Sequence, residues 1–152
     1  MLEMNKRMAA ALGERNFDSS TLDGALKDIA NSGFAVIDGC YFIQRLYDED
    51  TNVSASDFPD KSGYEAFINH LHIDDFVDQN FLNAGLCYVQ EVFKCWRSSQ
   101  SEKSLIAIIS FDETSLTVRL HVSRRGERIP AEDLEGYELE AVLVVDSEEQ
   151  GF

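Results

Sequence analysis

The sequence predicts an α+β protein in which N-terminal helices pack on a C-terminal antiparallel β-meander of three or four strands. Apolar residues recur at helical spacing through the first two thirds of the chain, and after Ser98 the spacing changes to the period of two that is typical of strands. Short polar turns separate these later segments. Consecutive strands joined by short turns favour an antiparallel sheet, which the helices would cover.

The first clear helix is predicted over residues 21–31. Leu22, Leu26 and Ile29 share one of its faces, and Gly33 stands where a C-terminal cap is expected. Residues 1–18 are predicted as an N-terminal segment with a short helix that could fray.

Residues 34–47 fit two interpretations. The spacing of their apolar residues fits one helix, whereas the apolar runs on either side of Gly39 fit a strand that is broken at the glycine. In both interpretations the segment is expected to be buried. The stretch 48–62 is rich in Asp, Asn and Ser and is predicted as an exposed loop.

Two more helices follow this loop. Ser62 and Glu65 have the spacing of a capping box, so a helix is predicted to begin there. The longest periodic run comes next and predicts the central helix of the core. Its apolar stripe consists of Leu82, Leu86, Val89, Phe93 and Trp96.

Three strands are predicted after the long helix. Residues 105–109 are continuously apolar, as in a strand covered on both faces, and residues 112–115 form a hairpin turn. Residues 116–123 alternate, so one face of that strand is expected to be wet. The third strand is predicted over 138–145, and residues 147–152 are predicted as a flexible tail.

The chain has 152 residues, of which 44% are hydrophobic, and this fits a single domain spanning 1–152. Its 28 acidic and 13 basic side chains give a formal net charge of −15. Such a charge repels nucleic acids and anionic membranes and speeds encounters with cationic proteins. The composition therefore predicts a basic protein partner and excludes nucleic acid and membrane as partners.

The lengths of the apolar runs and the number of cysteines predict the cellular compartment. The chain has no apolar run of the length that crosses a membrane. Its three cysteines, Cys40, Cys87 and Cys95, are an odd number without the spacing of a disulfide framework. A reducing compartment, the cytoplasm, is expected.

Catalytic motifs are absent from the sequence. No serine lies in a glycine-flanked elbow, no cysteine has the local setting of a known nucleophile family, and no glycine-rich loop could cradle a phosphate. We therefore expect a protein that is not an enzyme and needs no cofactor.

Metal sites are also not predicted. Asp48, Asp50 and Asn52 have the spacing of a calcium loop, but Val53 and Pro59 occupy positions that should be Gly and Glu. His70 and His72 lie near the end of a predicted helix, where residues two apart point to different faces and cannot share a metal ion.

Two other conspicuous features have structural explanations. Trp96 is expected in the core because it belongs to the long apolar stripe. The basic cluster 124–128 is expected to be a solvated turn, balanced by Glu132 and Asp133, because the field of the whole molecule opposes contact with phosphates.

Acidic side chains concentrate in the exposed loop and again before the long helix. In the loop, Tyr47 and Phe58 could add aromatic anchors for a partner. Before the helix, the three aspartates are explained equally well by the helix dipole and by binding. The candidate partner-binding residues are Tyr47, Asp48, Glu49, Asp50, Asp57, Phe58, Asp74, Asp75 and Asp78.

The last third of the chain resembles a known family. Its pattern is Ser110-Phe111-Asp112 leading into the strand 116–121, an arginine-bearing loop, the acidic-Gly-Tyr turn at 132–137 and the strand 140–144. This pattern is similar to the C-terminal part of bacterial contact-dependent growth inhibition immunity proteins. The likeness identifies no interface residues, because these vary between members of that family.

The resemblance implies a cytoplasmic protein without enzymatic activity. Such proteins neutralise a cognate toxin, commonly a nuclease, by binding it in a one-to-one complex. A nuclease presents a basic surface to its polyanionic substrate, and an acidic protein could occlude that surface or the active site. The alternatives are an adaptor or regulatory domain that binds another basic protein, or a small enzyme of unfamiliar type.

Overall fold

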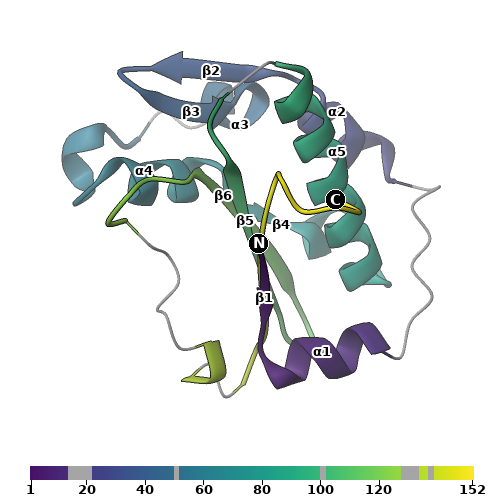
Figure 1. The fold of residues 1–152 in the computed structure, drawn as a ribbon. Helices are drawn as coiled ribbons and strands as arrows, with labels where there is room; N and C mark the ends of the chain where they lie inside the picture. The colour runs from purple at the N-terminus through teal and green to yellow at the C-terminus, as the bar shows by residue number, and fades with distance from the viewer. Residues whose placement is uncertain (14–21, 50–51, 100–101, 128–133, 137–138) are drawn as a thin grey trace.

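A computed structural model describes residues 1–13, 22–49, 52–99, 102–127, 134–136 and 139–152. Figure 1 shows the arrangement of the helices and strands. In chain order they are β1 (Leu2–Met4), α1 (Lys6–Gly13), α2 (Gly24–Ala30), β2 (Phe34–Ile37), β3 (Cys40–Ile43), α3 (Gln44–Glu49), η1 (Ala55–Asp57), α4 (Lys61–Ile68), β4 (Leu71–His72), η2 (Ile73–Asp75), α5 (Phe81–Ser98), β5 (Leu105–Phe111), β6 (Leu116–Val122), η3 (Leu134–Gly136) and β7 (Ala141–Asp146). The α+β class predicted from the sequence is confirmed.

The main sheet has the strand order β1-β7-β5-β6-β4, and every neighbouring pair is antiparallel. The third predicted strand therefore pairs with β5 on the side away from β6, so the order is not that of a simple meander. This strand, β7, begins at Ala141, whereas the sequence predicted a start at residue 138. The continuously apolar β5 lies at the centre, as its sequence predicts.

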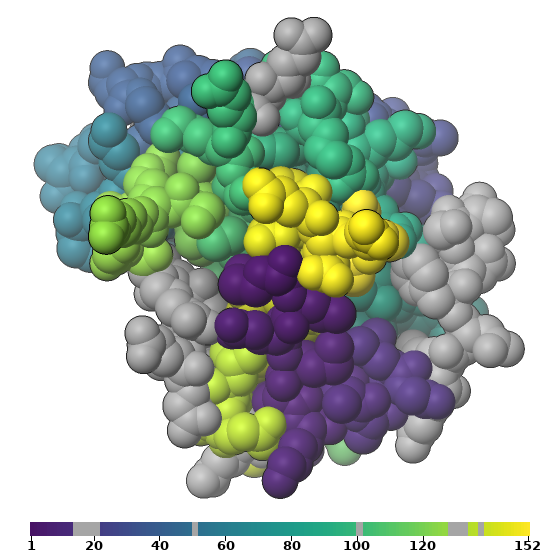
Figure 2. Space-filling view, viewed as in Figure 1, coloured from purple at the N-terminus to yellow at the C-terminus, as the bar shows by residue number. Residues whose placement is uncertain are grey.

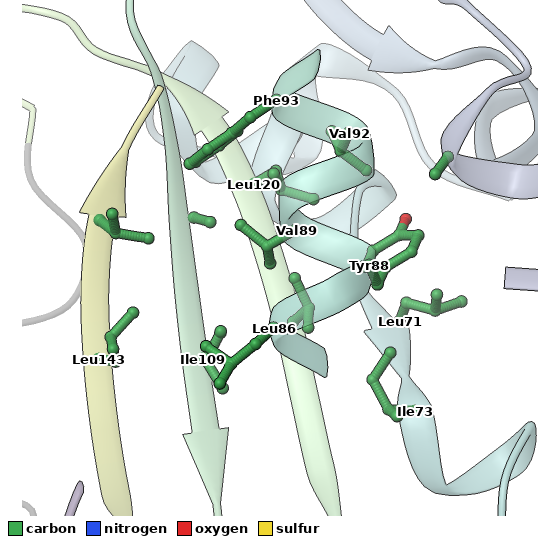
Figure 3. Close-up of a cluster of buried hydrophobic side chains, with 14 of the residues drawn as sticks. Leu71, Ile73, Leu86, Tyr88, Val89, Val92, Phe93, Ile109, Leu120 and Leu143 are labelled. Atoms are coloured by element: carbon green, nitrogen blue, oxygen red, sulfur yellow. The ribbon is translucent and has the colours of Figure 1, made fainter. Parts of the chain in front are cut away.

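The long helix α5 covers one face of this sheet and forms the core with it. Figure 3 shows Leu86, Val89 and Phe93 of α5 opposite apolar side chains of β5, β6 and β7. Trp96 is also buried, as predicted. Gly85 allows close approach, because a Cβ at this position would lie 2.7 Å from Leu116 Cδ2 on β6.

The opposite face of β6 is less exposed than its alternating pattern predicts. Thr117 and Arg119 are half-buried and His121 is buried, although all three belong to the face that was expected to be wet. Apolar side chains of β5, β7 and η3 form a second, smaller cluster on this side of the sheet: Ile108, Leu134, Val142 and Val144. A sheet with apolar clusters on both faces leaves little of β6 to solvent.

The ambiguous segment 34–47 is a β-hairpin followed by a short helix. Asp38 and Gly39 have φ values of 51° and 80°, as a two-residue hairpin turn requires. β3 is largely buried, but Val36 and Ile37 of β2 are exposed. The prediction that the whole segment is buried is therefore wrong for Val36 and Ile37. β2 and β3 form a separate two-stranded sheet.

Both ends of the chain pack against the sheet. Residues 2–4 form the edge strand β1 beside β7, where the sequence predicted only a short helix. The segment predicted as a flexible tail contacts the core through Phe152, and Gln90 Nε2 donates a hydrogen bond to Gly151 O. In Figure 2 the C-terminal residues (yellow) lie directly against the N-terminal ones (purple). The terminal amine also pairs with the Asp146 and Glu149 carboxylates.

Two helix boundaries differ from the predictions. α2 begins at Gly24, because the Asp23 carboxylate accepts hydrogen bonds from Ala25 N and Leu26 N and caps the helix. α4 is capped by Asp60, which accepts from Gly63 N, so Ser62 is not the cap residue. Within the described parts of the chain, no helix is both long enough and apolar enough to cross a bilayer.

Candidate functional site

The predicted partner-binding residues lie mainly on α3, η1 and η2. Eight of the nine belong to the described residues; Asp50 lies outside them. The structure brings some of them together in two hollows. Tyr47 and Phe58 line one hollow, and Glu49 and Asp75 line the other.

The first hollow has a volume of 710 Å³ and lies between the β2–β3 hairpin, η1 and the start of α4. Tyr47 stacks on Phe42 with ring centroids 4.9 Å apart, and Phe58 stacks on Tyr64 at 5.1 Å. Both predicted anchors are therefore half-buried members of an aromatic cluster. Each of the two side chains keeps part of its surface exposed to solvent.

The second hollow has a volume of 490 Å³ and contains His70 and His72 together with Glu49 and Asp75. The two imidazole centroids are only 4.6 Å apart. The prediction that these rings point to different faces is wrong, because α4 ends at Ile68 and the chain at this point is extended, where residues two apart share a face.

His70 is held neutral in this hollow. Burial, then the charge of Arg119 and then His72, lower the pKa of His70 from 6.5 to about 4. Its Nε2 atom is buried and has no hydrogen-bond partner among the described residues. Within the residues that the structure describes, no group of three His, Cys, Asp or Glu side chains could hold a metal ion.

Three of the predicted acidic residues have structural roles. Asp74 Oδ1 accepts a hydrogen bond from Leu116 N at 3.0 Å, which ties η2 to the start of β6. Asp57 accepts from Ser54 N at 2.8 Å in a capping box on η1. Asp48 accepts from Gln44 Nε2 one helical turn earlier. These carboxylates contribute to folding, which sequence spacing alone did not indicate.

The other acidic candidates are exposed. The side chains of Glu49, Asp75 and Asp78 make no hydrogen bond or ion pair with another described residue. Even if each of the 13 basic side chains paired with one carboxylate, 15 of the 28 acidic side chains would stay unpaired. A cationic partner would meet carboxylates that do not have to leave an internal partner first.

A network of buried polar groups, which we call the hairpin anchor, fixes the hairpin to the rest of the fold. It consists of Glu65 of α4, Asn69 at the C-terminal cap of α4, and Arg124 after β6. The fully buried Glu65 carboxylate accepts hydrogen bonds from Tyr41 N at 2.6 Å and Val122 N at 3.0 Å, and it forms a two-pronged pair with Arg124. Asn69 accepts from Ile43 N at 2.8 Å.

The hairpin anchor overturns two sequence predictions. Glu65 does not close a capping box, because its side chain points inward to β3 and β6. Arg124 does not belong to a solvated turn; its side chain is 16% exposed and also donates to Gly39 O. Its pairing with Glu65 raises the pKa of Arg124. The predicted balancing acids Glu132 and Asp133 lie outside the described residues.

Cys40, which lines the first hollow, and Cys95 of α5 are poor nucleophiles. Burial, with the nearby Glu65 charge, raises the pKa of Cys40, and burial likewise raises the pKa of Cys95. Cys95 Sγ donates a hydrogen bond to Asn31 Oδ1. A thiol with a raised pKa stays protonated near neutral pH and does not act as a thiolate nucleophile there.

A third hollow lies on the other face of the hairpin, against the C-terminal end of α5. It has a volume of 670 Å³ and is lined by Phe34, Val36, Tyr41 and Trp96. Phe34 and Tyr41 both meet the Trp96 ring edge-on, with centroids 5.0 and 5.3 Å away. This hollow was not predicted from the sequence, although the strand interpretation of residues 34–47 would place Phe34 and Val36 on the same face of a strand.

Comparison with known proteins places the chain in a family. It is similar to the "Uncharacterized protein PM0498" of Pasteurella multocida (strain Pm70), with 29% identity over 142 residues that cover 85% of this chain and 88% of that protein. No solved structure matches. The family model described as "Uncharacterized protein PM0498 family" matches residues 3–152. The chain therefore belongs to the PM0498 family.

Proposed function

We propose that the protein is an acidic immunity protein that binds a cognate basic toxin one-to-one and neutralises it by occluding its active site or substrate surface. The observation that carries this proposal is the excess of unpaired carboxylates, among them Glu49 and Asp75 at the rim of one hollow. The toxin class that fits best is a nuclease, because an enzyme that holds a polyanion needs a basic cleft. The proposal places the protein in the cytoplasm.

The resemblance of the last third to contact-dependent growth inhibition immunity proteins supports the same role and stays a prediction. Of the turn at 132–137 that helps to carry it, residues 132, 133 and 137 lie outside the described residues, and Leu134–Gly136 form η3. A basic contact surface on the partner is expected from the net charge alone.

Salt dependence tests the electrostatic basis of the proposal. The tagged protein would be used to capture its partner at low salt, and the association rate would then be measured at low and high ionic strength. We expect the rate to fall steeply as salt screens the two surfaces. An association rate that does not change with salt would contradict the proposal.

Charge-neutral variants locate the contact surface. The double variant Glu49→Gln/Asp75→Asn should associate more slowly than the wild type, because it removes carboxylates from the proposed surface. The matched control is Glu102→Gln/Glu113→Gln, which removes the same charge from exposed positions elsewhere. Equal slowing by both variants would show that only the net charge matters. It would contradict the assignment of the contact surface to Glu49 and Asp75.

A further inference from the structure

The β2–β3 hairpin has one satisfied edge and one open edge. On the β3 side, the hairpin anchor pairs the outward-pointing backbone: Tyr41 N donates to Glu65 and Ile43 N donates to Asn69, which in turn donates to Tyr41 O. Side chains of α4 and of its C-terminal cap residue thus pair three of the four outward N–H and C=O groups of Tyr41 and Ile43.

The β2 edge has no such cover. The two-residue turn at Asp38–Gly39 makes Ile37 and Cys40 the first hydrogen-bonded pair of the hairpin. Hydrogen-bonded and non-hydrogen-bonded pairs alternate along an antiparallel ladder. The N–H and C=O groups of Phe34 and Val36 therefore point away from β3. They have no partner among the described residues. Figure 1 shows β2 as the outermost strand at the top of the view.

Apolar side chains accompany this open edge. Val36 is 58% exposed and Ile37 is 37% exposed, and they are neighbours on one strand. Because successive side chains of a strand alternate between faces, Val36 lines the hollow at Trp96 and Ile37 lines the hollow at Tyr47 and Phe58. A strand added beside β2 would direct its own side chains alternately toward these two hollows.

We propose that the open edge of β2 receives an extended, basic segment of the partner, which adds to the hairpin as a third strand. This inference rests on the proposed function for the identity of its occupant. Backbone hydrogen bonds would supply affinity, and the two hollows would select alternate side chains. Charge complementarity favours a basic segment, because the molecule carries a net charge of −15. The two hollows add a small local excess of acid: Asp38 and Asp60 line one beside Lys61, and Glu91 lines the other beside Lys94.

A second copy of this chain is a worse occupant on the same grounds. Pairing β2 with β2 of another molecule would bring two strongly acidic proteins, each with a net charge of −15, into contact. Exposed apolar edge strands invite such self-pairing unless something opposes it. Here the like charge opposes it, whereas it attracts a basic segment.

A peptide of eight alternating lysine and valine residues tests the edge without the natural partner. We expect its binding to shift the backbone NMR signals of residues 34–37 first. Methylating alternate peptide nitrogens removes hydrogen bonds without changing charge, and it should weaken binding about tenfold. A glutamate–valine peptide should not bind. Signals that shift all over the acidic surface, or equal binding of the methylated or acidic peptide, would overturn the proposal.

The protein variant for this test is Val36→Pro. Proline removes the outward N–H while leaving the hydrogen-bonded pairs of the hairpin intact, and edge strands tolerate it. It should weaken peptide binding about tenfold, with the wild-type circular dichroism spectrum retained. The control for lost apolar surface is Leu139→Ala, at a side chain that is 83% exposed and distant in sequence; it should bind the peptide normally.

The two proposals fail separately. If the natural partner binds Val36→Pro as tightly as the wild type, the edge proposal is wrong and the immunity proposal stands. If the peptide binds at residues 34–37 but no basic partner is captured, the edge is a strand-binding site and the immunity proposal is wrong. A wild-type dimer that Val36→Pro abolishes in sedimentation would show a second copy as the occupant and overturn the proposal.

Discussion

At the residue scale, the buried Glu65 carboxylate controls how the hairpin is held. Its oxygens accept two backbone N–H groups from different strands and the guanidinium of Arg124. Burying a charge is costly unless it is paired and hydrogen-bonded, and removing one partner leaves the other uncompensated. The stability of the hairpin should therefore depend on Arg124 much more than on its neighbour Arg125.

Replacing Arg124 with methionine should lower the free energy of unfolding by about 3 kcal/mol, because Glu65 would remain buried without its cation. The exposed neighbour supplies the control: Arg125→Met should change stability by less than about 0.5 kcal/mol. Urea denaturation measures both. Adding Glu65→Gln to Arg124→Met should cost less than the two single changes together, and strict additivity would contradict the pairing.

His70 predicts a pH dependence of stability. The pKa of His70 is about 4 in the folded protein and 6.5 in the unfolded chain. Between pH 4 and pH 6.5 the unfolded chain therefore binds a proton on His70 that the folded protein does not bind. The stabilisation is complete above pH 6.5 and is lost as the pH falls toward 4. We expect His70→Gln to lose less stability than the wild type over this window. An NMR titration that places the His70 pKa near 6.5 would contradict the account.

At the element scale, long periodic segments were predictable and short ones were not. The stripe of α5 and the apolar run of β5 determine those elements by local pattern, because each buries one continuous surface. The hairpin could not be distinguished from a helix, since its hydrogen-bond partners on α4 and at the cap of α4 lie 24 to 26 residues away. Likewise, β1 has only three residues and exists through its pairing with β7.

Glycine substitutions test the packing of α5 on the sheet. Gly85→Ala should lower stability by about 1–2 kcal/mol despite the better helix propensity of alanine, because the added methyl would meet the buried Leu116. In Gly24→Ala the new Cβ has no atom within 4 Å, so that variant should be neutral or slightly stabilising. Thermal unfolding compares them. A Gly85→Ala protein as stable as Gly24→Ala would refute this close approach.

At the scale of the whole molecule, the net charge was predictable from the sequence. Which carboxylates accept hydrogen bonds within the fold and which do not was not predictable. Composition alone indicates a basic partner, whereas the structure shows that Asp57 and Asp74 serve local hydrogen bonding and that Glu49 and Asp75 do not. Side-chain spacing carries no information about the partner of Asp74, because Leu116 N lies 42 residues away in the sequence. The open β2 edge was missed for the same reason, because an edge exists only once the sheet order is known.

The net charge also predicts how salt affects the free protein. Self-repulsion among the carboxylates should destabilise the compact state, and added salt screens it. The melting temperature should therefore rise by about 2–4 °C between low and moderate sodium chloride concentrations, which corresponds to about 1 kcal/mol. Calorimetry checks this, with sucrose as a control for general solvent effects. A melting temperature that falls with salt would indicate that attractive pairs dominate.

Capture and inhibition of the partner test the central claim most directly. The tagged chain would be incubated at low salt with a lysate of the cells that encode it, and any stoichiometric partner would be assayed for nuclease activity with and without added chain. The account predicts one basic protein whose activity falls in proportion to the chain added, up to one equivalent. No partner, or many weak ones that leave with salt and keep their activity, would contradict it.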